Sequence, residues 1–126
     1  MRFCFDIDGV ICENKVGDLT YKTVRPLPEA IEHLQQLWKD GHYIILCTGR
    51  HMKTCEGNLG RVIAKQGKTL LDWLETHKVP YDELYFGKPH YDLVIDDAAH
   101  KHTDWDTTAK AILDRIQKGP RGPENP

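Results

Sequence analysis

The most constraining feature of this chain is an apolar stretch near its start that runs into two acidic residues and a glycine. The stretch Phe3–Ile7 is rich in apolar and β-favouring residues, which predicts a buried parallel strand covered on both faces. Asp6 and Asp8 lie two positions apart, so the alternation of a strand places both carboxylates on one side. Gly9 allows a sharp turn and a close approach of a ligand to the main chain. Such acids lie where open α/β sheets bind ligands, and burying both requires a counter-cation or a shared proton.

Length and charge limit the classes of protein to consider. The 126 residues suit one domain, expected over residues 1–118, and a Pro- and Gly-rich tail over 119–126 is expected to be disordered. With 17 basic and 19 acidic residues the net charge is −2, which gives no indication of an electrostatic nucleic-acid binder. No apolar run approaches the roughly 20 residues of a membrane span, and no signal-like segment precedes Asp6. We therefore expect a cytoplasmic protein without a membrane partner.

The apolar pattern predicts alternating strands and helices, and helical spacing directs Trp38, Leu71 and Leu113 toward the core, among other residues. The order predicts an α/β fold, a mostly parallel Rossmann-like sheet flanked by helices. In chain order we expect a β-hairpin flap over Ile11–Val24, a helix from Glu29 that stops at Gly41, a strand over Tyr43–Cys47, a loop over His51–Gly67 with one helical turn at most, a helix over Thr69–His77, strands over Glu83–Phe86 and Asp92–Ile95, and a helix over Thr103–Lys118.

The four cysteines, Cys4, Cys12, Cys47 and Cys55, show no CxxC pairing. Cys4 and Cys47 fall inside predicted buried strands, where a free cysteine behaves as a small hydrophobic residue. Reduced structural thiols are therefore favoured over a disulfide or a metal site.

Each predicted strand ends in a group that can take part in chemistry, and parallel strands bring such groups to one edge of the sheet. Several carboxylates meeting there would repel one another unless a hard cation lay among them, and oxygen ligands indicate magnesium. A hydroxyl, a glycine amide and a lysine are suitable donors for a phosphate. Together they predict phosphoryl transfer. The groups are Asp6 and Asp8, then Thr48 and Gly49, then Lys88, then Asp96 and Asp97.

Each of these groups has a plainer interpretation when it is taken alone. A DxDG sequence also occurs in calcium loops and turns. Thr48-Gly49 is typical of a turn that ends a strand, Lys88 can be an ordinary exposed lysine, and Asp96-Asp97 can cap a helix. Their joint placement after four successive predicted strands favours the functional interpretation.

On these residues the chain resembles the haloacid dehalogenase-like (HAD) phosphohydrolase superfamily, of the type without a cap domain. The match extends over nearly the whole chain to about Leu113. Within the superfamily, the loop with Asn58 and the helix from Thr69 make it similar to small bacterial phosphatases of capsule and surface-polysaccharide synthesis. The four superfamily motifs are met by Asp6-Ile7-Asp8-Gly9-Val10, Leu46-Cys47-Thr48-Gly49-Arg50, Lys88 and Asp96-Asp97.

The resemblance implies that Asp6 attacks phosphorus and becomes a phosphoaspartate, while Asp8 protonates the leaving alcohol and then activates water. It implies that Mg²⁺ is held by Asp6, the main-chain carbonyl of Asp8 and Asp96, with Asp97 supporting the site.

It further implies that Thr48, the Gly49 amide and Lys88 bind the transferring phosphoryl group. The expected activity is a magnesium-dependent phosphomonoesterase acting on a small phosphorylated metabolite, a sugar phosphate of surface-polysaccharide synthesis first. A nucleotide or polynucleotide-end phosphatase and a non-catalytic regulatory module are the alternatives.

Further residues are candidates for contacting the substrate. Arg50, His51 and Lys53 follow the second strand and can contact an anionic substrate, although a solvated rim is an equal alternative. His90 and Tyr91 lie beside Lys88 and can line the mouth of the site. Because no cap is expected, closure by a neighbouring subunit of a homo-oligomer or by a large substrate is expected instead.

Overall fold

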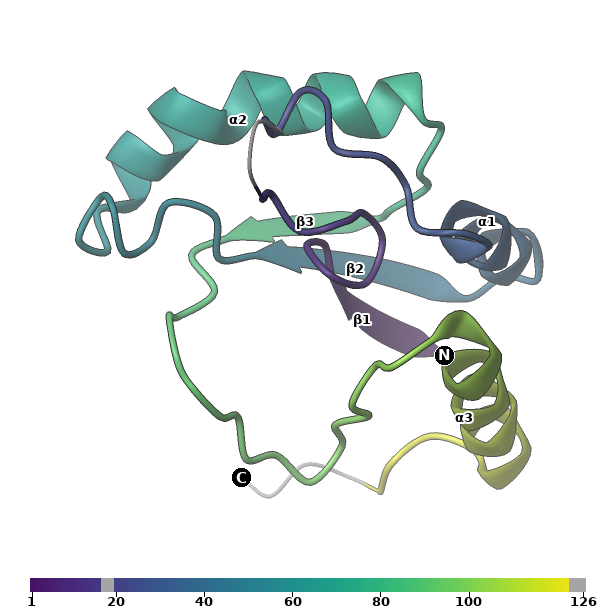
Figure 1. Ribbon diagram of the computed structural model, residues 1–126. Coiled ribbons are helices and arrows are strands. Elements are labelled where there is room, and N and C mark those ends of the chain that lie inside the picture. Colours follow the sequence, from purple (N-terminus) through teal and green to yellow (C-terminus); the bar gives the residue numbers. More distant parts are fainter. Residues whose placement is uncertain (17–19, 123–126) are drawn as a thin grey trace.

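A parallel sheet lies at the centre of the computed structural model, which describes residues 1–16 and 20–122 (Figure 1). Within these residues its strands are β1 (Arg2–Asp6), β2 (Tyr43–Thr48) and β3 (Glu83–Phe86), in the spatial order β1-β2-β3. The register places Asp6 beside Cys47 and Thr48 beside Phe86. The carboxyl ends of all these strands therefore meet at one edge of the sheet, and the α/β class is confirmed.

The helices connect and cover these strands, as parallel pairs require. α1 (Ala30–Lys39) joins β1 to β2, α2 (Leu59–Thr76) joins β2 to β3, and α3 (Trp105–Lys118) follows β3. Figure 1 shows α2 on the β3 side of the sheet and α3 on the side of β1. The largest fully buried side chains belong to Ile7, Ile11, Leu34, Ile44, Leu46, Leu70 and Leu74.

Two tryptophan side chains hold α3 and the segment before α1 against this core. The Trp105 ring stacks on Phe5 with centroids 5.9 Å apart, and its indole nitrogen donates to the Val10 carbonyl over 2.8 Å. The Trp73 indole donates to the Val24 carbonyl over 2.9 Å. α3 and the segment before α1 are thus held by buried rings whose N–H groups are satisfied.

α2 begins ten residues earlier than the predicted helix over Thr69–His77, so the expected loop over His51–Gly67 is wrong in its second half. Gly60 and Gly67 each weaken a helix interior, which hides the pattern in the sequence. The side chain of Asn58 caps the helix by accepting the Arg61 amide over 3.0 Å.

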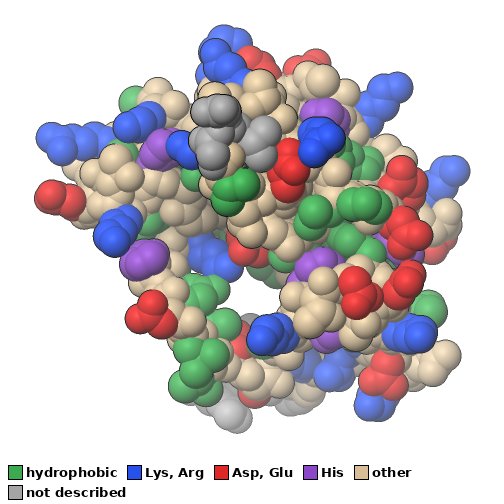
Figure 2. Space-filling view, viewed as in Figure 1, with side chains coloured by type: hydrophobic (Ala, Val, Ile, Leu, Met, Phe, Trp, Pro, Cys, Tyr) green, Lys and Arg blue, Asp and Glu red, His purple; other side chains and the backbone are tan. Residues whose placement is uncertain are grey.

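The expected fourth strand over Asp92–Ile95 does not form. Leu93, Val94 and Ile95 are instead 76%, 52% and 91% exposed. The segment between β3 and α3 curves away from the sheet in Figure 1, and Figure 2 shows an opening beside it. An apolar run of three residues becomes a strand only by pairing with another strand and packing against the core, and this segment does neither.

The expected hairpin over Ile11–Val24 is also wrong as far as the structure describes it; residues 17–19 lie outside the described part. The segment closes through a single antiparallel bridge between Cys12 and Pro26, and a turn runs over residues 20–23. Pro26 has no N–H to extend a ladder, so the segment is a loop.

Several side chains expected in the core are exposed, namely those of Trp38, Leu71 and Leu113. All four cysteines are free, as predicted, but Cys4 is exposed because β1 is an edge strand and is not covered on both faces.

The start of the last helix differs slightly from expectation, whereas its end at Lys118 is as predicted. α3 starts at Trp105 behind the cap residue Asp104, two residues later than predicted. Of the tail, residues 119–122 are described and 123–126 lie outside the described part. Among the described residues, no helix is long and apolar enough to cross a membrane.

The Asn58 cap provides a test of where α2 begins. Asn58→Ala should lower the free energy of unfolding by about 1 kcal/mol, because the Arg61 amide loses its acceptor. Asn58→Asp keeps an acceptor and serves as the control. Urea unfolding measures both variants, and an unchanged Asn58→Ala midpoint would contradict a helix that starts at Leu59.

Candidate functional site

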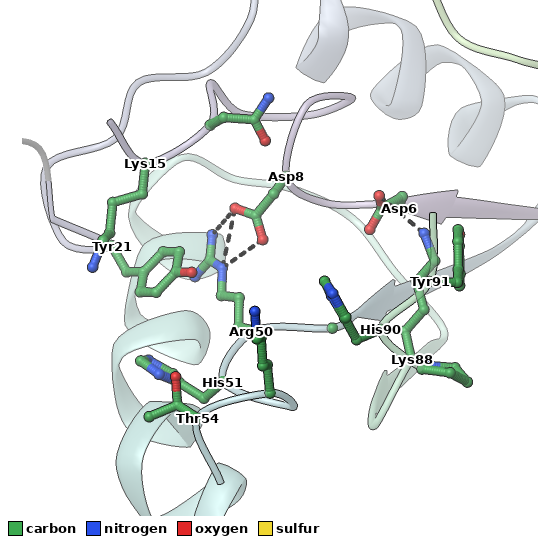
Figure 3. A pocket seen from close by; sticks show the side chains of 14 residues that line it. Asp6, Asp8, Lys15, Tyr21, Arg50, His51, Thr54, Lys88, His90 and Tyr91 are labelled. Carbon is green, nitrogen blue, oxygen red and sulfur yellow. Dashed lines mark hydrogen bonds and ion pairs between the residues drawn. The ribbon is translucent and has the colours of Figure 1, made fainter. Parts of the chain in front are cut away.

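A cleft of about 570 Å³ opens at the carboxyl ends of the strands (Figure 3). Its walls come from four separate parts of the chain: the loop after β1, the segment before α1, the loop after β2 and the loop after β3. The residues that line it are Asp6, Asp8, Asn14, Lys15, Tyr21, Gly49, Arg50, His51, Lys53, Thr54, Lys88, Pro89, His90 and Tyr91.

Asp6 and Lys88 form one ion pair in this cleft. Asp6 ends β1, and its Oδ2 lies 3.1 Å from Lys88 Nζ. The main chain of Lys88 is fixed to the end of β2, because its N–H donates to the Thr48 carbonyl over 3.0 Å. The Asp6 side chain is 33% exposed, so one carboxylate at the sheet edge remains accessible to a ligand.

Neighbouring groups stabilise the charged form of Lys88. Partial burial alone would lower the pKa of Lys88, but hydrogen bonds with Tyr91 and Asp6 outweigh burial and raise its pKa above the ordinary value. Its ammonium group lies 5.2 Å from the centroid of the Tyr91 ring. Lys88 is therefore a fixed positive charge beside the accessible carboxylate.

Asp8 and Arg50 form a second, more enclosed pair. Arg50 Nε donates to Asp8 Oδ2 over 2.9 Å and Nη2 donates to Oδ1 over 3.0 Å, as the dashed lines in Figure 3 show. The remaining nitrogen, Nη1, donates to Gln66 Oε1 on α2 over 2.9 Å. The Tyr21 ring covers the guanidinium at 4.2 Å from its centroid. The Arg50 side chain is fully buried and holds Asp8 in place. It therefore does not belong to a solvated rim, which was the alternative interpretation of its sequence position.

Gly9 shapes the turn that carries Asp8 away from β1. Its φ of 83° lies in the left-handed region that favours glycine. The turn is closed by the Gly9 amide, which donates to the Cys12 carbonyl over 2.8 Å, and by the Ile11 amide, which donates to Ile7. The DxDG sequence thus places two carboxylates of different accessibility at the end of one strand.

Thr48 and Gly49 end β2 but lie differently in the site. Thr48 is fully buried, its hydroxyl oxygen accepts the Arg50 amide over 3.2 Å, and it is not among the lining residues. Gly49 lines the cleft, and a Cβ there would lie 3.0 Å from the Lys88 carbonyl oxygen. Glycine is therefore needed where the loops after β2 and β3 touch.

His51, Lys53 and His90 line the cleft, as the sequence analysis proposed. Partial burial, together with the positive charges of Lys65, Lys15 and Arg50, lowers the pKa of His51. His51 is consequently neutral at neutral pH. The electrostatic environment around it is positive.

Several members of this site are not evident from the sequence, whereas Tyr91 lines the cleft beside His90, as expected. Lys15, Tyr21 and Gln66 belong to loops or to a helix face, and no local pattern marks them. Only the tertiary fold shows that Tyr21 covers Arg50 and that Gln66 reaches it from α2.

The structure does not bring Asp96 and Asp97 to Asp6 and Asp8. They follow the strand that does not form. Asp96 Oδ1 accepts the Ala98 amide over 3.0 Å, and Asp97 pairs with Arg121 over 2.9 Å.

Within the described part of the chain, no three His, Cys, Asp or Glu side chains are placed to hold a metal ion. The two carboxylates in the cleft each face a cation. As they lie, these residues do not fit the expected magnesium site.

Two thiols lie on the strands behind the Asp6–Lys88 pair. Cys4 Sγ on β1 and Cys47 Sγ on β2 are 3.8 Å apart. The hydrogen bond with Cys47 lowers the pKa of Cys4 to about 7; partial burial opposes this shift and the charge of Lys88 adds to it. The same contact raises the pKa of Cys47.

Neither a scan against protein-family models nor a comparison with proteins of curated function finds a match for the chain. Among solved structures, the crystal structure of a structural-genomics target from Vibrio cholerae is 30% identical, with a TM-score of 0.73. The similarity covers 90% of this chain and 97% of that one.

The lowered pKa of Cys4 gives a test of the electrostatics behind the cleft. Alkylation requires the thiolate, so a pKa of about 7 predicts a half-maximal rate near pH 7 for Cys4 in the folded protein. The buried Cys12, whose pKa burial raises to about 12, should react far more slowly. Mass spectrometry of iodoacetamide-treated protein measures each site, with Cys4→Ser as the control. A Cys4 midpoint near the ordinary value of about 8.5 would contradict this arrangement.

Proposed function

This chain belongs to the same family as the Vibrio cholerae protein, and we propose that it is a phosphomonoesterase that uses Asp6 as its nucleophile. The observation that carries the proposal is the accessible carboxylate of Asp6 beside Lys88 Nζ, at 3.1 Å, at the carboxyl ends of parallel strands. A carboxylate nucleophile divides phosphate-ester hydrolysis into two easier steps. The HAD resemblance of the sequence supports the same assignment, and a small sugar phosphate is the proposed substrate.

In the first proposed step an oxygen of Asp6 attacks phosphorus, and the bond between phosphorus and the ester oxygen breaks. Lys88 and the Gly49 amide, both from residues that line the cleft, would donate to the phosphoryl oxygens on which negative charge develops. Asp8, which must take up a proton from solvent before this step, gives that proton to the leaving alcohol. A phosphoaspartate at Asp6 is the product of this step.

In the second step water attacks the phosphorus of the phosphoaspartate, and Asp8 takes the proton of that water. Phosphate leaves and the Asp6 carboxylate is restored, so the proton given up in the first step is regained. Because Arg50 occupies both oxygens of Asp8, this role requires Asp8 to release one of these contacts when the leaving oxygen approaches.

Asp6→Asn tests the nucleophile. The amide keeps the shape of the side chain but cannot form the phosphoaspartate, so turnover of an aryl phosphate should fall to background. Asp114→Asn, an exposed change on α3 away from the cleft, is the matched control. Circular dichroism establishes that both variants fold. Activity of Asp6→Asn above about a tenth of the wild-type rate, which is less than about 1.4 kcal/mol of lost stabilisation, would exclude Asp6 as the nucleophile.

We also propose that the activity requires magnesium, whose chemistry would be charge neutralisation at the phosphoryl group. In the described residues only Asp6 and Asp8 place carboxylates in the cleft, so the implied ligand Asp96 would have to approach them.

Two measurements, of turnover and of hydrogen exchange, test the magnesium proposal. Chelation should abolish turnover, and calcium should restore it poorly because its larger, looser shell positions ligands less well. Magnesium should also slow hydrogen exchange over residues 92–97 in the absence of substrate. Full activity after chelation, or equal rates with both ions, would contradict the proposal.

The cleft is open to solvent, and α2 takes up most of the chain between β2 and β3, which leaves little length for a cap domain. A homo-oligomer in which a neighbouring copy covers the cleft stays a prediction. The preference for sugar phosphates over nucleotides is also a prediction. Measuring turnover of a panel of sugar phosphates and nucleotides tests it.

A further inference from the structure

The cleft contains more positive charge than its two carboxylates balance. Lys15, Arg50, Lys53 and Lys88 line it together with Asp6 and Asp8. Lys88 pairs with Asp6 at 3.1 Å and Arg50 with Asp8 at 2.9 Å. Within residues 1–16 and 20–122, neither Lys15 nor Lys53 belongs to an ion pair. Two lysines therefore remain after the carboxylates are neutralised.

One of these two lysines, Lys15, lies away from the site of the proposed reaction. In Figure 3, Asp6, Lys88 and Tyr91 gather at one end of the cleft, and Lys15 and Tyr21 lie at the other. Lys15 Nζ lies 5.1 Å from the centroid of the Tyr21 ring. A cation held over an aromatic face is partly positioned before a ligand arrives. The far end of the cleft thus has a positioned cation that the phosphoryl group at Asp6 does not use.

Arg50 does not supply the anion contact at this end. All of its side-chain nitrogens already donate to Asp8 or Gln66, and the side chain is fully buried. Partial burial lowers the pKa of the neighbouring His51, and the charge of Arg50 adds to this effect together with those of Lys65 and Lys15. A neutral imidazole can donate a hydrogen bond to an anion without adding a further charge.

We infer that Lys15 and Lys53 form a second anion subsite, so that the substrate is a phosphomonoester with a second anionic group, a carboxylate or a phosphate, remote from the ester. The inference rests on the proposed function for the position of the ester at Asp6. A cleft of about 570 Å³ is large enough for a small molecule with both groups. The neutral part of the metabolite would lie between the two ends.

Turnover of three matched compounds tests the subsite: a hexose monophosphate, the phosphorylated aldonic acid of the same sugar, and its bisphosphate. The wild-type protein should have a lower KM for one or both of the doubly anionic compounds. The aldonic acid and the bisphosphate separate a carboxylate from a phosphate as the second group. Added salt should reduce the preference, because both lysines are solvent-accessible.

Lys15→Gln and Lys53→Gln should each raise KM for the preferred compound by about threefold to tenfold, with kcat little changed. KM for the hexose monophosphate should change by less than about twofold. Lys101→Gln, an exposed change outside the lining residues, is the matched control. Equal KM values for all three compounds, or equal effects of either lysine variant on all of them, would overturn the subsite.

Binding of non-hydrolysable phosphonate analogues separates this inference from the proposed function. Calorimetry should show tighter binding of the phosphonate analogue of the aldonic acid, of the hexose bisphosphonate, or of both, than of the monophosphonate, and Lys15→Gln should remove most of the difference. That result without turnover of any phosphate ester would retain the subsite and reject the phosphatase. Turnover with no difference between the analogues would retain the phosphatase and reject the subsite.

Discussion

The arrangement of the cleft depends on the buried guanidinium of Arg50. It is held by Asp8 after β1, by Gln66 on α2 and by the ring of Tyr21 from the segment before α1. A buried charge is tolerated only when its partners are in place, and the loss of one partner of such a pair costs about 3 to 5 kcal/mol. Because Asp8 is 22% exposed, the lower end of this range applies here. One side chain therefore fixes the relative positions of three segments that the sheet alone does not connect.

This constraint gives the two acidic residues of the DxDG sequence different properties. Asp8 has both oxygens occupied by Arg50 and sits on the enclosed side of the turn at Gly9. Asp6 has a single cation, Lys88, whose long side chain is partly exposed. A nucleophile must be accessible, whereas a group that transfers protons must be held at a defined position. The difference in burial thus agrees with the division of roles that the sequence resemblance implies.

The strands of the sheet were predictable because Phe3–Ile7 and Tyr43–Cys47 are near-continuous apolar runs, which few other structures accommodate. Lys88 and Gly49 were predictable as site residues because each directly follows such a strand. The start of α2 was not, because Gly60 and Gly67 disguise a helix that the Asn58 cap and tertiary packing stabilise. The role of Arg50 was missed because the burial of a charge depends on partners distant in the sequence. For Leu93–Ile95, apolar composition alone did not provide a pairing partner.

The most direct test of the account is chemical trapping of the covalent intermediate. The wild-type protein would be mixed with an aryl phosphate, quenched in acid during turnover, digested and examined by mass spectrometry. The account predicts one added phosphoryl group on the peptide with Asp6, localised to that side chain and absent from Asp6→Asn. Rapid turnover with a phosphoryl group on another residue, or with none on any residue under conditions where the second step is rate-limiting, would contradict it.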